Sequence, residues 1–270
     1  MQMIDAIRAD AAKVLQEGRA KLVIGYRARG GHRGPVFLSD PAGAAALVYD
    51  DACKQNLAVY LRKPEVRARM PVAVVAPPAV MRSLVLLAAE AQLKGPEVVV
   101  LAVGDGVYHG VLDLAGVEAL LKEKYAGLAP SPDLLRRIEE LAAMTPEQRA
   151  AFWTAEFAKC TRCYACRAAC PGCYCSRCIV EKNMPQWIST AAAEHGNYAW
   201  NVIRAFHLAG RCTLCGACEA ACPQGIPLML LNGMLAEDVA RQFGAKPGYD
   251  REAKPVIGSW NPDDDQGFIR

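Results

Sequence analysis

Apolar residues along the first half of the chain either recur at helical spacing or gather in short runs. Runs such as VAVVA and EVVVLAV are short and rich in β-branched residues, which is typical of buried strands. Strands are predicted at residues 21–26, 36–38, 46–49, 72–76 and 97–103. Helices are predicted at residues 1–18, 51–61, 80–93 and 116–125. This alternation predicts an α/β N-terminal domain with a mostly parallel sheet, placed at residues 1–145.

A glycine-rich basic stretch, residues 27–35 (RARGGHRGP), follows the first predicted strand. Gly30, Gly31 and Gly34 have the spacing of neither a dinucleotide fingerprint nor a P-loop. We therefore interpret the stretch as a turn, with a phosphate contact as the alternative.

The pattern changes at Thr145, where a cap, a proline and an acidic first turn predict a helix that runs to about residue 159. Further helices are predicted at residues 197–209 and 227–243. We expect residues 146–243 to form a second domain, and residues 244–270 to form a polar C-terminal tail that lies over a surface or a partner. The tail carries an acidic run, Asp263 to Asp265.

Composition places the chain among folded proteins, because 53% of its residues are hydrophobic and only 22% are charged. A net charge of +3 gives no reason to invoke nucleic acid. No run of about 20 apolar residues predicts a transmembrane segment. Residues 1–12 carry Asp5, Arg8 and Asp10 and do not resemble a signal peptide. We therefore expect a cytoplasmic protein with reduced thiols.

Cysteine is the residue type that points to chemistry. Of twelve cysteines, all but Cys53 lie between Cys160 and Cys222. Dense cysteines in a reducing compartment indicate metal or redox chemistry. Residues 160–171 (CTRCYACRAACP) and 212–223 (CTLCGACEAACP) are two copies of C-x2-C-x2-C-x3-C-P, the run of bacterial two-cluster ferredoxins.

In this run the first three thiolates fit corners of one [4Fe–4S] cube, and the fourth leads away to the other cube. The first cluster is therefore assigned to Cys160, Cys163, Cys166 and Cys222. The second cluster is assigned to Cys212, Cys215, Cys218 and Cys170. The alternative, a zinc-bound interaction module, fits poorly, because four-cysteine zinc sites use two knuckles with a long spacer.

Three further cysteines, Cys173, Cys175 and Cys178, lie between the two copies. With Cys53 they make a third set of four, which raises the hypothesis of a third [4Fe–4S] cluster. Cys53 follows Asp51 at the start of a predicted helix, where a thiolate is favoured. The alternative is that Cys53 is a small buried hydrophobe.

Other residues near the cysteines carry weaker signals. The basic ones either raise a cluster's potential and steer an acidic carrier, or form a solvated surface; they are Lys159, Arg162, Arg167, Arg177 and Arg211. The histidines follow no ligand or catalytic spacing: His32, His109, His195 and His207. We assign Trp153, Trp187 and Trp200 to the core. No hydrolytic or acid–base motif is present, so no catalytic residue is assigned.

The chain resembles the iron–sulfur beta-subunit family of formate dehydrogenases and deazaflavin-dependent hydrogenases. Within it, the chain is most similar to the dicluster ferredoxin-type subunits that accompany heterodisulfide-reductase-like complexes. The segments that carry the resemblance are residues 160–178, 206–227, 243–269, 51–61 and 110–113. It implies a subunit that relays electrons, and some relatives bind a flavin and reduce a deazaflavin.

The sequence departs from the family pattern in two places. Residues 77–80 (PPAV) stand where relatives carry Lys-Gly-Cys-Asp, and residues 107–109 lack the cysteine that precedes Gly-Val-x-Asp in relatives. In relatives these cysteines help to hold the extra cluster. Their loss either argues against the third cluster or leaves Cys53 as its fourth ligand, and it disfavours FAD.

We therefore predict an electron-transfer subunit that relays single electrons through two [4Fe–4S] clusters, or three with the insertion. Its expected partners are other subunits of a cytoplasmic oxidoreductase complex of the hydrogenase, formate dehydrogenase or heterodisulfide-reductase-like type. Soluble ferredoxin is a further candidate partner. The alternative is a subunit that contains a flavin and exchanges electrons with a deazaflavin or nicotinamide carrier.

Overall fold

The computed structural model describes residues 3–127 and 130–257. Its first half is built on a five-stranded sheet in the order β2-β1-β3-β4-β5. The strands are β1 (Leu22–Arg29), β2 (His32–Leu38), β3 (Val72–Ala76), β4 (Val98–Gly104) and β5 (Val107–Leu112). β3 lies at the centre and is buried along its whole length, as its continuous apolar run predicts.

The sheet is mixed, which corrects the expectation of a mostly parallel one. β1, β3 and β4 pair in parallel, but β2 is antiparallel to β1 and β5 is antiparallel to β4. Each edge strand returns through a two-residue turn whose residues have positive φ: Gly30 and Gly31, then Asp105 and Gly106. Such turns suit the twist of a hairpin. The glycine-rich stretch is thus a hairpin turn rather than a long loop.

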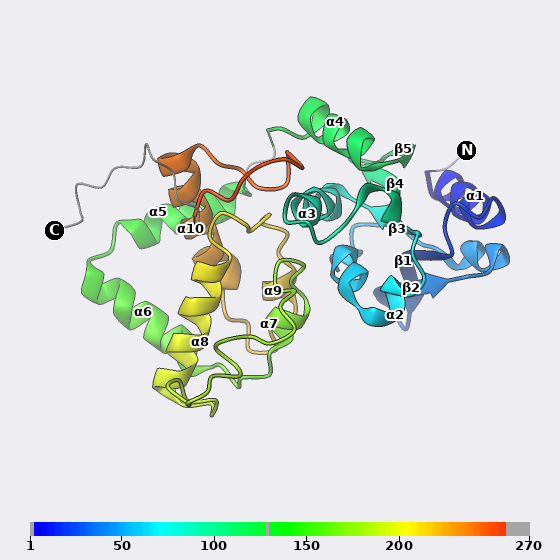
Figure 1. The fold of residues 1–270 in the computed structure, drawn as a ribbon. Helices are drawn as coiled ribbons and strands as arrows, with labels where there is room; N and C mark the ends of the chain where they lie inside the picture. Colours follow the sequence, from blue (N-terminus) through cyan, green and yellow to red (C-terminus); the bar gives the residue numbers. More distant parts are fainter. Residues whose placement is uncertain (1–2, 128–129, 258–270) are drawn as a thin grey trace.

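Helices cover both faces of this sheet (Figure 1). α1 (Met3–Gln16) packs on one face through Ile7, Ala11 and Val14. α3 (Pro78–Ala89) and α4 (Leu114–Lys124) cover the other face. Residues 80–87 of α3 are all buried. A helix that is buried on all sides must pack against other elements on more than one face. α3 packs against the sheet on one face and against the second half of the chain on another.

The segment that connects the β1–β2 hairpin to β3 differs from the prediction. Residues 51–61 do not form one helix; turns lead into a 3-10 helix, η2 (Leu57–Arg62), followed by the one-turn helix α2 (Pro64–Arg67). Asn56 caps η2 by accepting a hydrogen bond from the Ala58 amide at 3.1 Å. Such local side-chain bonds compete with helix formation. Residues 46–49 form no strand; η1 (Pro41–Ala46) is followed by a single bridge between Tyr26 and Val48.

The second half is helical and has its own hydrophobic core. Its helices are α5 (Pro132–Ala142), α6 (Pro146–Ala158), α7 (Ala165–Ala168), α8 (Glu194–His207), α9 (Ala217–Ala220) and α10 (Leu228–Phe243). Thr145 and Gln148 form the capping box that starts α6. α5 was not predicted from the sequence, and its Leu134 and Leu141 join this second core. Within the described part of the chain, no helix is long and apolar enough to cross a membrane.

The described part of the tail returns to the first half of the molecule, between α10 and α4 (Figure 1). The Pro247 carbonyl accepts a hydrogen bond from Arg82 at 3.0 Å, and the Tyr249 hydroxyl donates to the Tyr125 carbonyl at 2.9 Å. The Arg82 guanidinium also stacks on the Tyr249 ring at 4.7 Å. The tail thus lies over a surface, as expected. Residues 258–270, with the acidic run Asp263 to Asp265, are outside the described residues.

Gly248 is the position where this tail tolerates no side chain. Its φ is +87°, and a Cβ there would lie 2.6 Å from the Arg82 carbonyl oxygen. We predict that Gly248→Ala lowers the melting temperature and exposes the tail to proteolysis, at a cost of about 2 kcal/mol or more. Gly244→Ala is the matched control, because its φ is +64° and no atom lies within 4 Å of the added Cβ. It should cost about 1 kcal/mol, and equal losses for the two variants would contradict the tail contact.

Candidate metal centre

The two cysteine motifs share one backbone conformation. In the first copy, Arg162 and Tyr164 have left-handed φ values of +57° and +59°. At the same positions of the second copy, Leu214 and Gly216 have φ values of +56° and +75°. Three of these four are not glycine, so the conformation is held at some cost in strain. Left-handed residues in such turns direct successive amides into a concavity of the kind that binds iron–sulfur centres.

Each motif is completed by a cysteine of the other. One cavity, site 1, is lined by four cysteines: Cys160, Cys163, Cys166 and Cys222. A second cavity, site 2, is lined by Cys212, Cys215, Cys218 and Cys170. These are the two crossed sets that the spacing predicted. Among the described residues, no three His, Cys, Asp or Glu side chains are gathered as a single metal ion would require.

Helix α8 lies against the first motif through one polar face. Asn197 donates to the Cys160 carbonyl at 2.8 Å, and Arg204 donates to the Cys166 carbonyl at 3.1 Å. Between them, Trp200 is fully buried and packs edge-on against the Tyr164 ring. Asn197, Trp200 and Arg204 follow helical spacing, so a single rigid helix holds the first motif in place.

Burial controls the state of the thiols. Desolvation raises the pKa of Cys166, raises that of Cys218 to about 12 and raises that of Cys212 further. Donors reach the sulfur atoms directly: the Arg162 amide lies 3.4 Å from Cys160 Sγ and Asn232 Nδ2 lies 3.6 Å from Cys218 Sγ. Burial therefore favours the neutral form of these three thiols in the protein alone, and they would give up protons on binding iron.

Arg204 is a charged group that lies close to cysteines of both sites. Its side chain is only 4% exposed, and its Nε has no hydrogen-bond partner in the described part of the protein. Burial alone would lower the pKa of Arg204. The negative charge of four nearby cysteines outweighs this effect and raises the pKa: Cys173, Cys166, Cys218 and Cys170. A buried cation with no carboxylate partner is costly unless negative charge lies close by, and thiolate-bound clusters would supply it.

The α/β half contributes polar groups to site 2. Asn56 donates to the Ser83 hydroxyl at 2.9 Å, and Ser83 shares a hydrogen bond with Thr213 at 3.2 Å. All three side chains are buried. Burial raises the pKa of the Cys215 thiol, and a hydrogen bond from Asn56 acts in the opposite direction and lowers it. The environment of site 2 is thus shared between the two halves of the chain.

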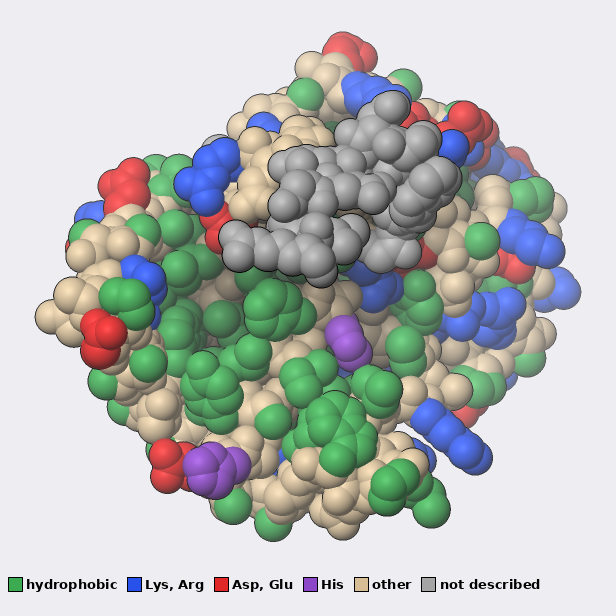
Figure 2. Space-filling model, turned by 60° about the vertical axis from the view of Figure 1, so that its left-hand side comes forward, with side chains coloured by type: hydrophobic (Ala, Val, Ile, Leu, Met, Phe, Trp, Pro, Cys, Tyr) green, Lys and Arg blue, Asp and Glu red, His purple; other side chains and the backbone are tan. Residues whose placement is uncertain are grey.

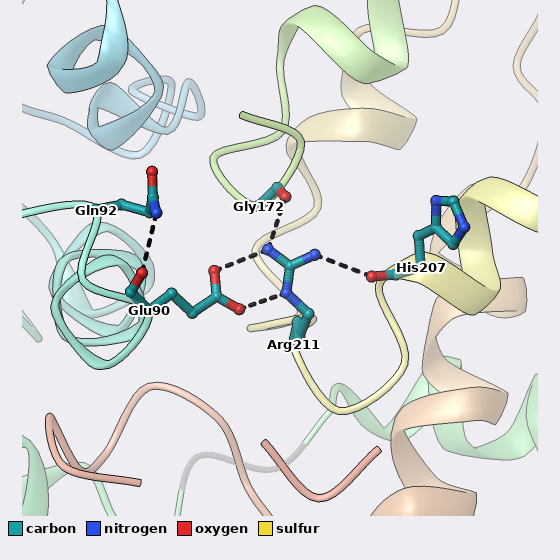
Figure 3. Close-up of polar contacts among 5 residues, drawn as sticks. All are labelled: Glu90, Gln92, Gly172, His207 and Arg211. Atoms are coloured by element: carbon teal, nitrogen blue, oxygen red, sulfur yellow. Dashed lines mark hydrogen bonds and ion pairs between the residues drawn. The ribbon is translucent and has the colours of Figure 1, made fainter. Parts of the chain in front are cut away.

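Arg211, which directly precedes Cys212, joins the two halves through an ion pair (Figure 3). Its guanidinium binds both carboxylate oxygens of Glu90, at the end of α3, with Nη2 at 2.8 Å from Oε2. It also donates to the carbonyls of Gly172 at 3.3 Å and His207 at 3.1 Å. A two-pronged arginine–carboxylate pair fixes orientation as well as distance. Arg211 therefore fixes α3, the insertion and the second motif relative to one another.

The cysteines of the insertion lie apart from Cys53. Cys173, Cys175 and Cys178 line one cavity beside α8. Cys53 is buried in the α/β half, where its Sγ lies 3.8 Å from Asp50 Oδ1, and it lines a different cavity together with Cys215. The structure does not bring Cys53 to the other three.

The remaining predicted residues are divided between core and surface. Arg162 is buried, Arg167 pairs with Glu181 at 2.7 Å and Lys159 pairs with Glu156 at 2.7 Å.

Trp153 and Trp200 are in the core as expected. Trp187 is 62% exposed, so its assignment to the core is wrong. The insertion that carries it has no helix or strand to bury it, because residues 170–193 are irregular.

Comparison with known proteins agrees with this geometry. Residues 159–227 match the model of the 4Fe-4S dicluster domain. The chain is 31% identical over 105 residues to the F420-dependent formate dehydrogenase subunit beta of Methanocaldococcus jannaschii. It is 32% identical over 110 residues to the F420-dependent formate dehydrogenase 1 subunit beta of Methanococcus maripaludis. The matches cover 39% and 41% of this chain, but only 27% and 28% of those relatives.

The protein therefore carries a 4Fe–4S dicluster domain of ferredoxin type. Its resemblance to the formate dehydrogenase beta subunits, inferred from the motifs, is confirmed by these relatives. The alternative of a zinc-bound module has no support, since the matched domain binds iron–sulfur clusters.

Sequence reasoning missed the residues that surround the cysteines. Asn197, Asn201 and Arg204 are polar positions that line one face of α8 around Trp200. Their i, i+4 and i+7 spacing places them on one face of a helix next to two cysteine motifs, and this pattern could have predicted that the face contacts the motifs. Asn56, Ser83 and Thr213 gave no such signal, because they come from three distant segments.

Arg204 gives a test of charge near both sites. We predict that Arg204→Met lowers the reduction potentials of both clusters by about 50–100 mV, because one buried charge at about 7–10 Å contributes about 2 kcal/mol. Arg204→Lys keeps the charge and should shift both potentials less. Potentials followed by electron paramagnetic resonance during a redox titration would measure this. A shift confined to one cluster, or equal shifts for both variants, would contradict the shared role of the charge.

Proposed function

We propose that this protein is an electron-transfer subunit of a multisubunit oxidoreductase, with a [4Fe–4S] cluster in each of sites 1 and 2. The observation that carries the proposal is the crossed lining of the two cavities, with three cysteines of one motif and the fourth of the other. When bound, such clusters carry single electrons. The surrounding residues hold the thiols, exclude water and supply amide donors.

We propose a division of labour along the chain. A docking unit comes first, a unit that holds the clusters follows and a tail comes last; from the sequence these are predicted at residues 1–145, 146–243 and 244–270. Because α5 packs into the second core, we place it with the cluster unit and draw the structural boundary just before Pro132. The contacts of Asn56, Ser83 and Glu90 support a docking unit that also shapes the environment of site 2.

The proposed partners are other subunits of a redox complex. Both relatives are beta subunits of formate dehydrogenases that depend on F420. The cluster half also exposes large apolar side chains: Ile179, Met184, Trp187, Tyr198, Phe206 and Phe243. Hydrophobic side chains gather on the face that Figure 2 turns forward. Exposed apolar groups of this size are typical of contacts between proteins, and a formate dehydrogenase-like or related complex would cover them.

A second candidate function rests on the cavity that contains Cys53. It has a volume of about 570 Å³ and lies between the two halves, where Cys215 of site 2 contributes to its wall. Pro77 and Pro78, at the start of α3, line the same cavity. A flavin bound there would lie beside a cluster ligand, and the protein would then exchange electrons with a deazaflavin or nicotinamide carrier.

The crossed ligation can be tested by comparing four cysteine variants of the full chain. We predict that Cys170→Ser loses the same cluster signal as Cys215→Ser, although Cys170 lies in the other motif. Cys222→Ser should lose the same signal as Cys163→Ser. Each variant should lose about four irons, as measured by iron analysis and electron paramagnetic resonance after anaerobic purification. If Cys170→Ser instead matched Cys163→Ser, the crossed assignment would be wrong.

The two candidate functions are separated by flavin content. We expect the anaerobically purified full chain to show no flavin absorption after its clusters are bleached. A flavin present at about one per chain would favour the second function. In that case Arg82→Met, which alters the wall of the cavity, should release it.

A further inference from the structure

The insertion between the two motifs encloses a cavity that neither site 1 nor site 2 uses. It has a volume of about 350 Å³ and lies between residues 172–179 and the C-terminal half of α8. Trp200, Leu208 and Ile179 give it apolar walls. Residues 170–193 contain no helix or strand, and long irregular segments within compact domains are commonly functional.

Four potential iron ligands line this cavity. Three are the thiols of Cys173, Cys175 and Cys178, and the fourth is His207 in the last turn of α8. The His207 carbonyl accepts from Arg211, and the imidazole projects away from that ion pair (Figure 3). We infer that these three cysteines and His207 hold a third iron–sulfur cluster. This inference builds on the proposed electron-transfer function and goes beyond sites 1 and 2.

Charge around the cavity fits a ligand that is an anion. Arg167, Arg177, Arg204 and Arg211 all line it. Arg167 and Arg211 are paired with Glu181 and Glu90, respectively. Arg204 has no carboxylate partner among the described residues, and its buried Nε has no hydrogen-bond partner. A cluster held by three thiolates and a neutral imidazole is negatively charged and would balance this cation.

The geometry also explains why His207 rather than Cys53 completes the set. Cys53 lines a separate cavity, whereas His207 lines the same cavity as the three thiols. Imidazole is an established iron–sulfur ligand and raises the potential relative to thiolate. The positive charge of the nearby arginines also raises the potential of the cluster. The third cluster therefore has a higher potential than a four-cysteine cluster in the same place would have.

The deciding experiment is pulsed electron paramagnetic resonance of the reduced, anaerobically purified full chain, together with iron analysis. The wild-type protein should contain about twelve irons and show a nitrogen hyperfine coupling from an imidazole bound to iron. His207→Ala should abolish that coupling and remove about four irons, and Cys178→Ser should do the same. His207→Cys should keep the iron, lose the coupling and lower the potential of one cluster.

His195→Ala is the matched control, because His195 is on the same helix but does not line the cavity. It should keep both the irons and the coupling. A wild-type protein with about eight irons would overturn the third cluster and leave the two crossed clusters intact. A coupling that is absent from the wild type, or that survives in His207→Ala, would overturn the histidine ligand. Loss of about four irons in Cys53→Ser with none in His207→Ala would restore Cys53 instead.

Discussion

The structure depends on the exchange of one cysteine between two motifs. Site 1 takes Cys222 from the second copy, and site 2 takes Cys170 from the first. Neither loop can therefore complete its own site, and the two copies must be held together before either can bind a cluster. The contact between α7 and α9, and the polar face of α8 against the first motif, supply that support. Under the proposed ligation, folding and cluster binding are coupled through the same residues.

The α/β half is attached to this centre by three contacts of different kinds. Arg211 forms an ion pair with Glu90, Thr213 shares a buried hydrogen bond with Ser83, and the tail lies over Arg82. Two of these residues, Arg211 and Thr213, are adjacent to Cys212. Any movement of α3 would thus reach the ligands of site 2 directly. This arrangement gives a physical route by which a partner docked on the α/β half would influence a cluster.

The positive charge around the clusters is also arranged by tertiary structure. Arg162, Arg167 and Arg211 flank cysteines in the sequence, but each has a structural partner: Arg162 stacks on Trp200, Arg167 pairs with Glu181 and Arg211 with Glu90. Arg204 lies outside both motifs, on α8, and is a buried cation close to cysteines of both. A residue that contributes positive charge near both sites is therefore not one that the motifs mark.

Local sequence was sufficient for the elements whose signals are local. The apolar runs predicted β3 and β4, and Thr145, Pro146 and Glu147 predicted the start of α6. It was insufficient where a neighbour in space decides the conformation. β5 forms because β4 offers a free edge after a tight turn, and residues 51–61 form turns because Asn56 caps η2 and binds Ser83.

The same distinction holds for the metal centre. The sequence by itself predicted the eight cysteines of the two motifs and their crossed pairing, because the reach of a short chain around a cube fixes that spacing. Only the tertiary structure decided that Cys53 lines one cavity with Cys215, while His207 lines another with Cys173, Cys175 and Cys178. Those positions are set by how α8 and the sheet pack, which depends on contacts between residues far apart in the chain.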